Sequence, residues 1–238
     1  MALSDPPSFV DLRLFAVEQE ALQNPSDDFE TGRHFLDLDQ SPAPVSIGLL
    51  QLNRSTGLVN SMNADEFIVV TRGTLSITVG SEQLILATGQ SALLPKGSRF
   101  SWDSKSPTSI IFMRHESDVA GGAPIAIDAT AELAPSAPPL AELLIGPTPS
   151  CRNHNDFKSA SGEFICGTWD STPYQRRVIS YRHFELMHLL EGSVTLEDAA
   201  GRSATFHKDD IFLVKQGARC SWLSEVHVKK VFAIYRPC

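Results

Sequence analysis

The chain of 238 residues is long enough for one large domain or two small ones, and a 42% hydrophobic, 20% charged composition is typical of a globular protein. Its net charge of -8 disfavours phosphate backbones and anionic lipid as partners, because both require a cationic field. We therefore expect neither a nucleic-acid nor a membrane partner. The early Pro6-Pro7, the lack of a long apolar run and four cysteines without a CxxC pair favour a cytoplasmic protein.

The first segment in chain order is an arm, expected over residues 1–30. Apolar residues over 8–23 lie loosely on one helical stripe that Pro25 ends, so this segment is either a helix packed on a domain or partly strand. Gly, Pro and Ala are concentrated in residues 118–140, which is typical of a linker. The expected domains are therefore 31–117 and 141–238.

Both expected domains have β patterns. Residues 66–79 are apolar and β-branched around Gly73, which predicts two strands joined by a tight turn at Arg72-Gly73. The corresponding stretch of the second half has its turn at Glu191-Gly192, followed by a hairpin tip over 198–201 and a strand over 211–214. Short strands with turn signals about every 8–12 residues predict a sandwich or a closed barrel.

The two halves also repeat each other. An offset of 119 aligns Glu66 with Glu185 and Gly73 with Gly192, and an offset of 120 aligns Trp102 with Trp222. Each half thus contains Glu-x6-Gly followed by Gly-x-Arg-x-Ser-Trp. Because the matches keep one register and include a rare residue type, we interpret the chain as two copies of one domain.

These motifs resemble those of the cupin superfamily, G-x5-H-x-H-x(3,4)-E-x6-G and G-x5-P-x-G-x2-H-x3-N. The second part of the pattern is Gly89-x5-Pro95-x-Gly97 in the first half and Asp209-x5-Lys215-x-Gly217 in the second. The region 167–222 resembles more particularly the subgroup that includes ethanolamine-utilisation cupins and ureidoglycine aminohydrolase. The resemblance implies an all-β bicupin with two tandem double-stranded β-helix (cupin, jelly-roll) barrels.

The cupin resemblance also implies four metal-ligand positions in each barrel. In the first half they hold Asn60, Met62, Glu66 and Phe100. One carboxylate among such residues is a poor ligand set, so we expect no metal in the N-terminal barrel. In the second half they hold Ile179, Tyr181, Glu185 and Cys220.

His183 adds a ligand to the second set. It precedes Glu185 by two residues, so both side chains are expected to face the barrel interior, with Tyr181 one step further along. His183, Glu185 and Cys220 would then offer nitrogen, oxygen and sulfur ligands to one divalent ion (Zn, Fe, Mn or Ni) with an open fourth position. The alternative is that Glu185 and His183 hydrogen-bond to each other in a polar cavity, with Tyr181 as a third member.

The second barrel is therefore the expected site of a small-molecule ligand. As an enzyme of amine, ureide or sugar-acid metabolism, it would use Glu185, His183 and Tyr181 as catalytic residues. Ligand contacts are expected from Trp169, Trp222 and Arg219, and the Gln175-Arg176-Arg177 cluster either attracts an anionic substrate or is a solvated strand end. The alternative function is a non-catalytic binding or structural cupin that has lost its metal site. A homodimer is also expected.

Overall fold

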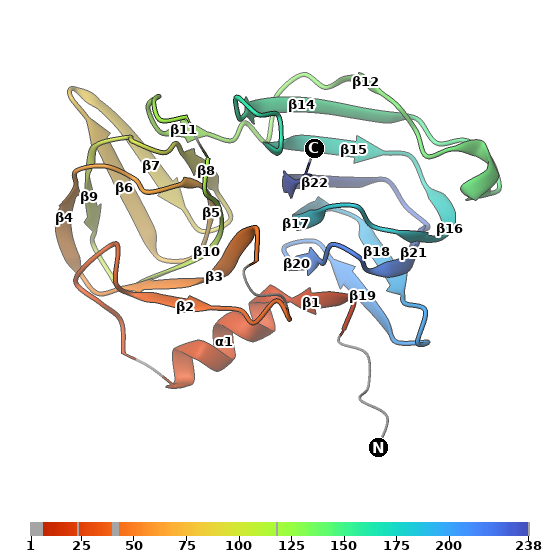
Figure 1. Ribbon diagram of the computed structural model, residues 1–238, viewed down its shortest axis with the longest axis horizontal. Coiled ribbons are helices and arrows are strands. Elements are labelled where there is room, and N and C mark those ends of the chain that lie inside the picture. The colour runs from red at the N-terminus through yellow and green to blue at the C-terminus, as the bar shows by residue number, and fades with distance from the viewer. Residues whose placement is uncertain (1–6, 23, 40–42, 118, 238) are drawn as a thin grey trace. The chain divides into compact units, whose positions relative to one another are not determined.

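The computed structural model describes residues 7–22, 24–39, 43–117 and 119–237 and divides into two compact units. The N-terminal barrel comprises Leu12–Ile127 together with Asp156–Phe164. The C-terminal barrel comprises the described chain up to Asp11, Asp128–Asn155 and the chain from Ile165 onward. Each unit is built mainly from antiparallel strands (Figure 1).

Two sheets form the N-terminal barrel. One has the strand order β11-β8-β5-β10-β3-β2 and the other β4-β9-β6-β7. The strands of the first sheet are β2 (Arg33–Phe35), β3 (Val45–Leu52), β5 (Asp65–Arg72), β8 (Ser91–Leu94), β10 (Thr108–His115) and β11 (Ile125–Ala126). Those of the second are β4 (Ser55–Val59), β6 (Thr74–Val79), β7 (Glu82–Ala87) and β9 (Phe100–Ser104).

Two sheets also form the C-terminal barrel, in the orders β1-β20-β17-β22-β15-β14-β12 and β13-β16-β21-β18-β19. The first contains β1 (Phe9–Asp11), β12 (Ala134–Ser136), β14 (Cys151–Lys158), β15 (Phe164–Ser171), β17 (Phe184–Glu191), β20 (Ile211–Val214) and β22 (Val228–Tyr235). The second contains β13 (Leu144–Ile145), β16 (Tyr174–Ser180), β18 (Ser193–Glu197), β19 (Ser203–His207) and β21 (Arg219–Ser224).

The strand orders explain the sequence repeat. The order β8-β5-β10-β3-β2 in one unit corresponds to β20-β17-β22-β15-β14 in the other, and β4-β9-β6-β7 corresponds to β16-β21-β18-β19. Equivalent strands lie 119 or 120 residues apart, as β5 and β17 or β10 and β22 do. The all-β fold with tandem jelly-roll barrels is thus confirmed.

Backbone conformation accounts for the glycine of the repeated Glu-x6-Gly pattern. Gly73 and Gly192 follow β5 and β17 with φ angles of +80° and +78°. A Cβ atom at Gly192 would lie 2.1 Å from the carbonyl oxygen of His227, so no other residue fits without movement of the backbone. At the next turn Gly89 has φ +86° and its counterpart Asp209 has φ +71°. Aspartate can replace glycine there because it tolerates positive φ angles better than most residues do.

The expected arm and linker contribute to both units. Within the arm, β1 pairs with β20, whereas α1 (Leu12–Leu22) groups with the N-terminal barrel. Within the expected linker, β11 pairs with β8 and β12 pairs with β14. The sequence offered no way to see this division, because strand pairing joins segments that are distant in the chain. Among the described residues, no helix has both the length and the apolar character required to span a bilayer.

The two barrel interiors differ in polarity. The N-terminal interior is packed with aliphatic and aromatic side chains, including Phe29, Phe100 and Trp102. The C-terminal interior is less uniformly apolar: Tyr181, Cys220 and Trp222 lie in its core, with Trp169 packed against them. Its polar side chains lie next to a cavity, which makes the C-terminal barrel the candidate site.

Candidate functional site

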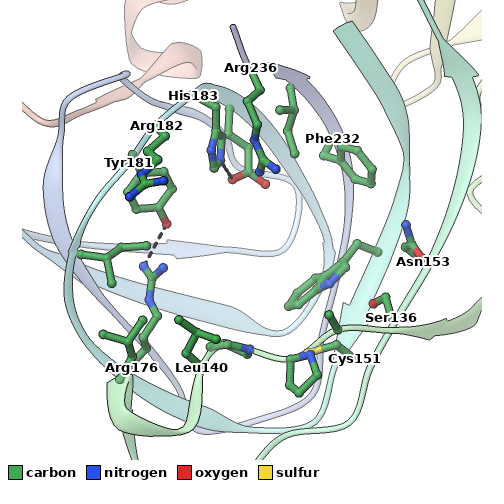
Figure 2. Close-up of a pocket in the computed structure, with 18 of the residues that line it drawn as sticks. Ser136, Leu140, Cys151, Asn153, Arg176, Tyr181, Arg182, His183, Phe232 and Arg236 are labelled. Atoms are coloured by element: carbon green, nitrogen blue, oxygen red, sulfur yellow. Dashed lines mark hydrogen bonds and ion pairs between the residues drawn. The ribbon is translucent and has the colours of Figure 1, made fainter. Parts of the chain in front are cut away.

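A cavity of about 1030 Å³ lies in the C-terminal barrel (Figure 2). Its walls come from β14, β15, β16, β17 and β22, and from the segment 136–143, which begins at the last residue of β12. The apolar part of the lining includes Leu140, Trp169 and Phe232. The volume is in the range of pockets that enclose a small organic molecule.

Glu185 organises the polar part of the lining. It lies near the start of β17, and its Oε2 atom is 3.2 Å from Nε2 of His183. Its Oε1 atom accepts a hydrogen bond of 2.7 Å from Nζ of Lys230, which comes from β22. Glu185 and Lys230 are both buried. The His183–Glu185 pair expected from the sequence is therefore present, with a lysine as an additional member.

Aromatic rings surround the Lys230 ammonium. Its Nζ atom lies 4.8 Å from the ring centre of Trp169 and 5.3 Å from that of Trp222. The two indole rings meet edge to face, 6.2 Å apart. Cation–π attraction and the hydrogen bond to Glu185 together offset the loss of hydration that a buried ammonium suffers.

These contacts keep Glu185 ionised. Burial by itself raises the pKa of the Glu185 carboxyl, but the charge of Lys230 and the hydrogen bond from His183 lower it well below its usual range. A carboxylate held so firmly in its anionic form is a weak base. Glu185 is therefore better suited to orient His183 and Lys230 than to accept a proton itself.

Arg176 and Tyr181 form a second polar pair on the cavity wall. One guanidinium nitrogen of Arg176 donates a hydrogen bond of 3.1 Å to the Tyr181 hydroxyl oxygen, and Figure 2 shows the two groups pointing toward each other. Arg176 is only 8% exposed, and its Nε atom has no hydrogen-bond partner among the described residues. Burial raises the pKa of Tyr181 above its usual range, although the charge of Arg176 opposes the shift, so the hydroxyl keeps its proton.

A β-bulge allows both residues to face the cavity. In a regular strand, residues five apart point to opposite faces of the sheet. The pairing of β16 with β21 shifts register between Arg176, opposite Trp222, and Ile179, opposite Cys220. The extra residue reverses the alternation, so the side chains on both sides of the bulge point inward.

Cys220 does not form a metal-binding cluster with His183 and Glu185. Within the residues that the structure describes, no three His, Cys, Asp or Glu side chains are gathered closely enough to hold a metal ion. Burial raises the pKa of the Cys220 thiol to about 11, which favours its protonated form.

The donor set therefore does not fit a divalent ion. Both oxygens of Glu185 are engaged, one of them by the Lys230 ammonium, which would repel an incoming cation. The ligand set expected from the sequence, His183, Glu185 and Cys220, is not assembled. The alternative, a hydrogen-bonded His183–Glu185 pair in a polar cavity, describes the observed geometry.

The remaining candidate residues have different surroundings. Trp169 lines the cavity, whereas Trp222 is buried in the core and stacks on Tyr174 with ring centres 5.7 Å apart. Arg219 is exposed and does not line the cavity. The reason is the alternation along β21, where Cys220 and Trp222 point inward and Arg219 points outward.

The sequence did not predict Lys230 as a site residue, and it left open whether Arg176 attracts an anionic substrate or lies at a solvated strand end. A signal for Lys230 was available, because it shares strand parity with Phe232, Ile234 and Arg236, which all line the cavity. A lysine on the inward face of a barrel strand requires a partner. For Arg176 no such signal existed, since the bulge that turns it inward is not visible in the sequence.

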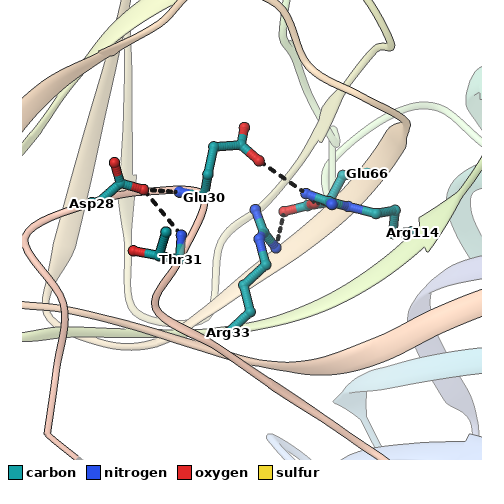
Figure 3. Close-up of polar contacts among 6 residues, drawn as sticks. All are labelled: Asp28, Glu30, Thr31, Arg33, Glu66 and Arg114. Carbon is teal, nitrogen blue, oxygen red and sulfur yellow. Dashed lines mark hydrogen bonds and ion pairs between the residues drawn. The ribbon is translucent and has the colours of Figure 1, made fainter.

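The equivalent glutamate of the N-terminal barrel, Glu66, is held by two arginines (Figure 3). Nη1 of Arg33 donates to Oε1 at 2.9 Å, and Nε of Arg114 donates to Oε2 at 2.7 Å. Arg114 also lies 3.8 Å from a carboxylate oxygen of Glu30. This cluster is bounded by the packed apolar core, with Arg33 over the Phe112 ring.

Comparison with known proteins gives the relationships of the chain. The family model described as the EutQ-like cupin domain matches residues 158–232. A search of curated proteins found no significant match. Among solved structures, the Cupin 2 conserved barrel domain protein from Leptotrichia buccalis is 9% identical with a TM-score of 0.60, covering 92% of this chain and 94% of that one.

Two further structures are similar. Salicylate 1,2-dioxygenase from Pseudoaminobacter salicylatoxidans is 12% identical with a TM-score of 0.59, covering 97% of this chain and 84% of its own, which shows a shared fold. A protein of unknown function in the DUF861 family, from Pseudomonas syringae pv. tomato, is 31% identical with a TM-score of 0.80. That match covers 88% of this chain and 90% of the other. The chain therefore belongs to the DUF861 family and has the cupin fold.

Proposed function

We propose that the C-terminal barrel binds a small organic acid whose carboxylate is held by Arg176. The observation that carries this proposal is the buried guanidinium beside the cavity, with one N–H group that has no partner in the described part of the chain. A buried unsatisfied donor of this kind is costly unless a ligand or water completes it. A planar guanidinium matches a carboxylate in geometry and charge.

The charge of the lining supports the same class of ligand. Among the described residues that line the cavity, the cationic ones are Arg176, Arg182, Lys230 and Arg236, and the only carboxylate is Glu185. Because Lys230 already neutralises Glu185, the arginines leave the cavity positive in a chain whose net charge is -8. Of the amine, ureide and sugar-acid ligands expected from the sequence, this lining favours the acid.

The rest of the cavity indicates an apolar body for that acid. Leu140 and Phe232 are part of the wall, and Trp169 presents an aromatic surface. Salicylate, which appears in the name of one protein of the same fold, combines a carboxylate with an apolar ring and is a suitable first probe. Tyr181, which keeps its proton, has a hydroxyl group able to donate to the second carboxylate oxygen.

The test is calorimetric titration of salicylate, benzoate and aliphatic acids into the wild type, Arg176→Gln and Arg177→Gln. Arg177 is the matched control, since it is the exposed neighbour on the same strand. Loss of charge-assisted hydrogen bonds worth about 1.5–3 kcal/mol predicts a roughly 10- to 100-fold weaker Kd for Arg176→Gln alone. Equal affinities in the two variants would refute the assignment of Arg176, and no binding of any acid would refute the function.

A second candidate function is acid/base catalysis on the bound acid. It is favoured by the His183–Glu185 contact of 3.2 Å and by the His183 ring lying 5.3 Å from the Tyr181 ring. Here His183 transfers the proton, Glu185 orients the imidazole and Tyr181 donates to the substrate. Exchange of ligand C–H hydrogens in D2O, followed by NMR, should be lost in His183→Gln. Absence of exchange in the wild type would leave the non-catalytic binding function.

A further inference from the structure

The two glutamates of the repeat share one electrostatic arrangement. Glu66 and Glu185 occupy equivalent positions on β5 and β17, and both are buried. In each case both carboxylate oxygens contact basic side chains. Arg33 and Arg114 contact the oxygens of Glu66, at 2.9 and 2.7 Å. Lys230 and His183 contact those of Glu185, at 2.7 and 3.2 Å.

The cations that neutralise the two glutamates come from different positions of the repeat. Strands β10 and β22 are equivalent at an offset of 120, so Lys230 aligns with Ile110 and Arg114 aligns with Ile234. Arg33 aligns with Arg152, whose half-exposed side chain pairs with Asp170. The two barrels have therefore kept a positive charge beside the glutamate while changing the residue that supplies it.

Aromatic rings support the buried cation in each barrel. The guanidinium carbon of Arg33 lies 4.7 Å from the ring centre of Phe112 and 5.6 Å from that of Phe29. The Lys230 ammonium lies between Trp169 and Trp222 at 4.8 and 5.3 Å. Such rings compensate a cation for lost water without competing for its hydrogen-bond donors. The cation sites are thus built for a protein side chain.

We propose that Lys230 in the C-terminal barrel, and Arg33 with Arg114 in the N-terminal barrel, take the place of a divalent metal ion beside the repeated glutamate, so that neither barrel recruits one. The occupied carboxylate oxygens offer a metal no free ligand, and the fixed positive charges repel it. This inference does not depend on the identity of the acid bound in the cavity. It concerns the cation that the barrel itself supplies.

The experiment replaces the built-in cation with one added from solution. Lys230→Ala removes the three carbons beyond Cβ and the ammonium group, which together correspond to the n-propylammonium ion. Added n-propylammonium would therefore refill the space between Glu185 and the two indole rings. We expect n-propylammonium chloride to raise the Tm of Lys230→Ala by about 3 °C or more, and n-propanol to have a much smaller effect. Lys229→Ala, on the neighbouring position of β22, is the matched control and should respond to neither.

Metal content is measured on the same proteins without any acid present. Wild type expressed with added zinc, manganese, iron and nickel should hold no stoichiometric metal by elemental analysis. Near-stoichiometric metal whose removal by a chelator lowers the Tm would overturn the proposal, as would equal stabilisation of Lys230→Ala by propanol and propylammonium. Neither the Tm shift nor the metal content involves acid binding. Titrations that refute acid binding at Arg176 would therefore leave this proposal intact, and the two failures can be told apart.

A double variant covers the case in which Lys230→Ala does not fold. Glu185→Gln combined with Lys230→Met removes both charges, so no uncompensated carboxylate stays buried. We expect this double variant to fold and to melt above either single variant. A double variant as defective as Lys230→Ala would show that Lys230 is needed for packing and not as the counter-ion of Glu185, which would overturn the proposal.

Discussion

The substitution Glu66→Gln should destabilise the N-terminal barrel strongly. The Glu66 side chain is 0% exposed, and its partners Arg33 and Arg114 are 3% and 15% exposed. The variant leaves the Arg33 guanidinium without its counter-charge and leaves Arg114 with only the more distant Glu30 carboxylate, at 3.8 Å. Two nitrogens of Arg33, Nε and Nη2, already have no hydrogen-bond partner among the described residues. Removing one member of a buried charge cluster costs about 3–5 kcal/mol. This is a large part of the roughly 5–15 kcal/mol that stabilises a typical domain.

Differential scanning calorimetry is the appropriate assay, because two compact units need not melt in one transition. At about 2–4 °C per kcal/mol, the transition of the N-terminal barrel should fall by roughly 6–20 °C. Glu82→Gln, at an exposed position on β7, makes the same chemical change and should melt within about 1 °C of wild type. Acid binding in the C-terminal barrel should be unchanged by Glu66→Gln and altered by Glu185→Gln. A Glu66→Gln protein as stable as Glu82→Gln would refute the reasoning.

Three further predictions concern the C-terminal barrel. Because the native pKa of Glu185 lies below its usual value of 4.5, its ion pair with Lys230 stabilises the fold fully above that pH, and this contribution is lost as the pH falls further. In urea unfolding, the stability difference between wild type and Glu185→Gln should therefore shrink from about pH 5 to pH 3; a constant difference would contradict it. Because Cys220 is fully buried and its pKa is raised to about 11, iodoacetamide at pH 8 should alkylate it at least roughly 100-fold more slowly in the native than in the unfolded protein, measured by peptide mass spectrometry; equal rates would contradict this. Gly192→Ala should destabilise more than Gly201→Ala, although both have φ +78°, because only at Gly192 would the new Cβ meet a backbone oxygen, whereas that of Gly201 meets open space. Equal urea midpoints for the two variants would refute this explanation.

The strand architecture could be predicted from the sequence with good accuracy. The hairpin with its turn at Arg72-Gly73 is present as β5 and β6, and the expected strand over 211–214 is β20. Local patterns suffice here because alternation and turn residues act over a few neighbouring positions. The repeat then allowed one half to be interpreted from the other.

Part of the site was also visible in the sequence. The i, i+2 spacing of His183 and Glu185 placed both side chains in one interior, as the structure shows. The resemblance to cupins directed attention to the ligand positions, but a ligand set alone does not reveal what else reaches the carboxylate. Lys230 reaches Glu185 from a strand that lies 45 residues further along the chain.

The sequence by itself thus determined the duplication, the strands and their inward faces, because these follow from local backbone preference and from period-two burial. Only the tertiary structure decided the chemistry of the interior. The bulge in β16 turned Arg176 inward, and the pairing of β17 with β22 placed Lys230 beside Glu185. Charge neutralisation in a barrel depends on which side chains contact each other across neighbouring strands. Strand register and β-bulges determine those contacts, and neither can be recognised from the local sequence.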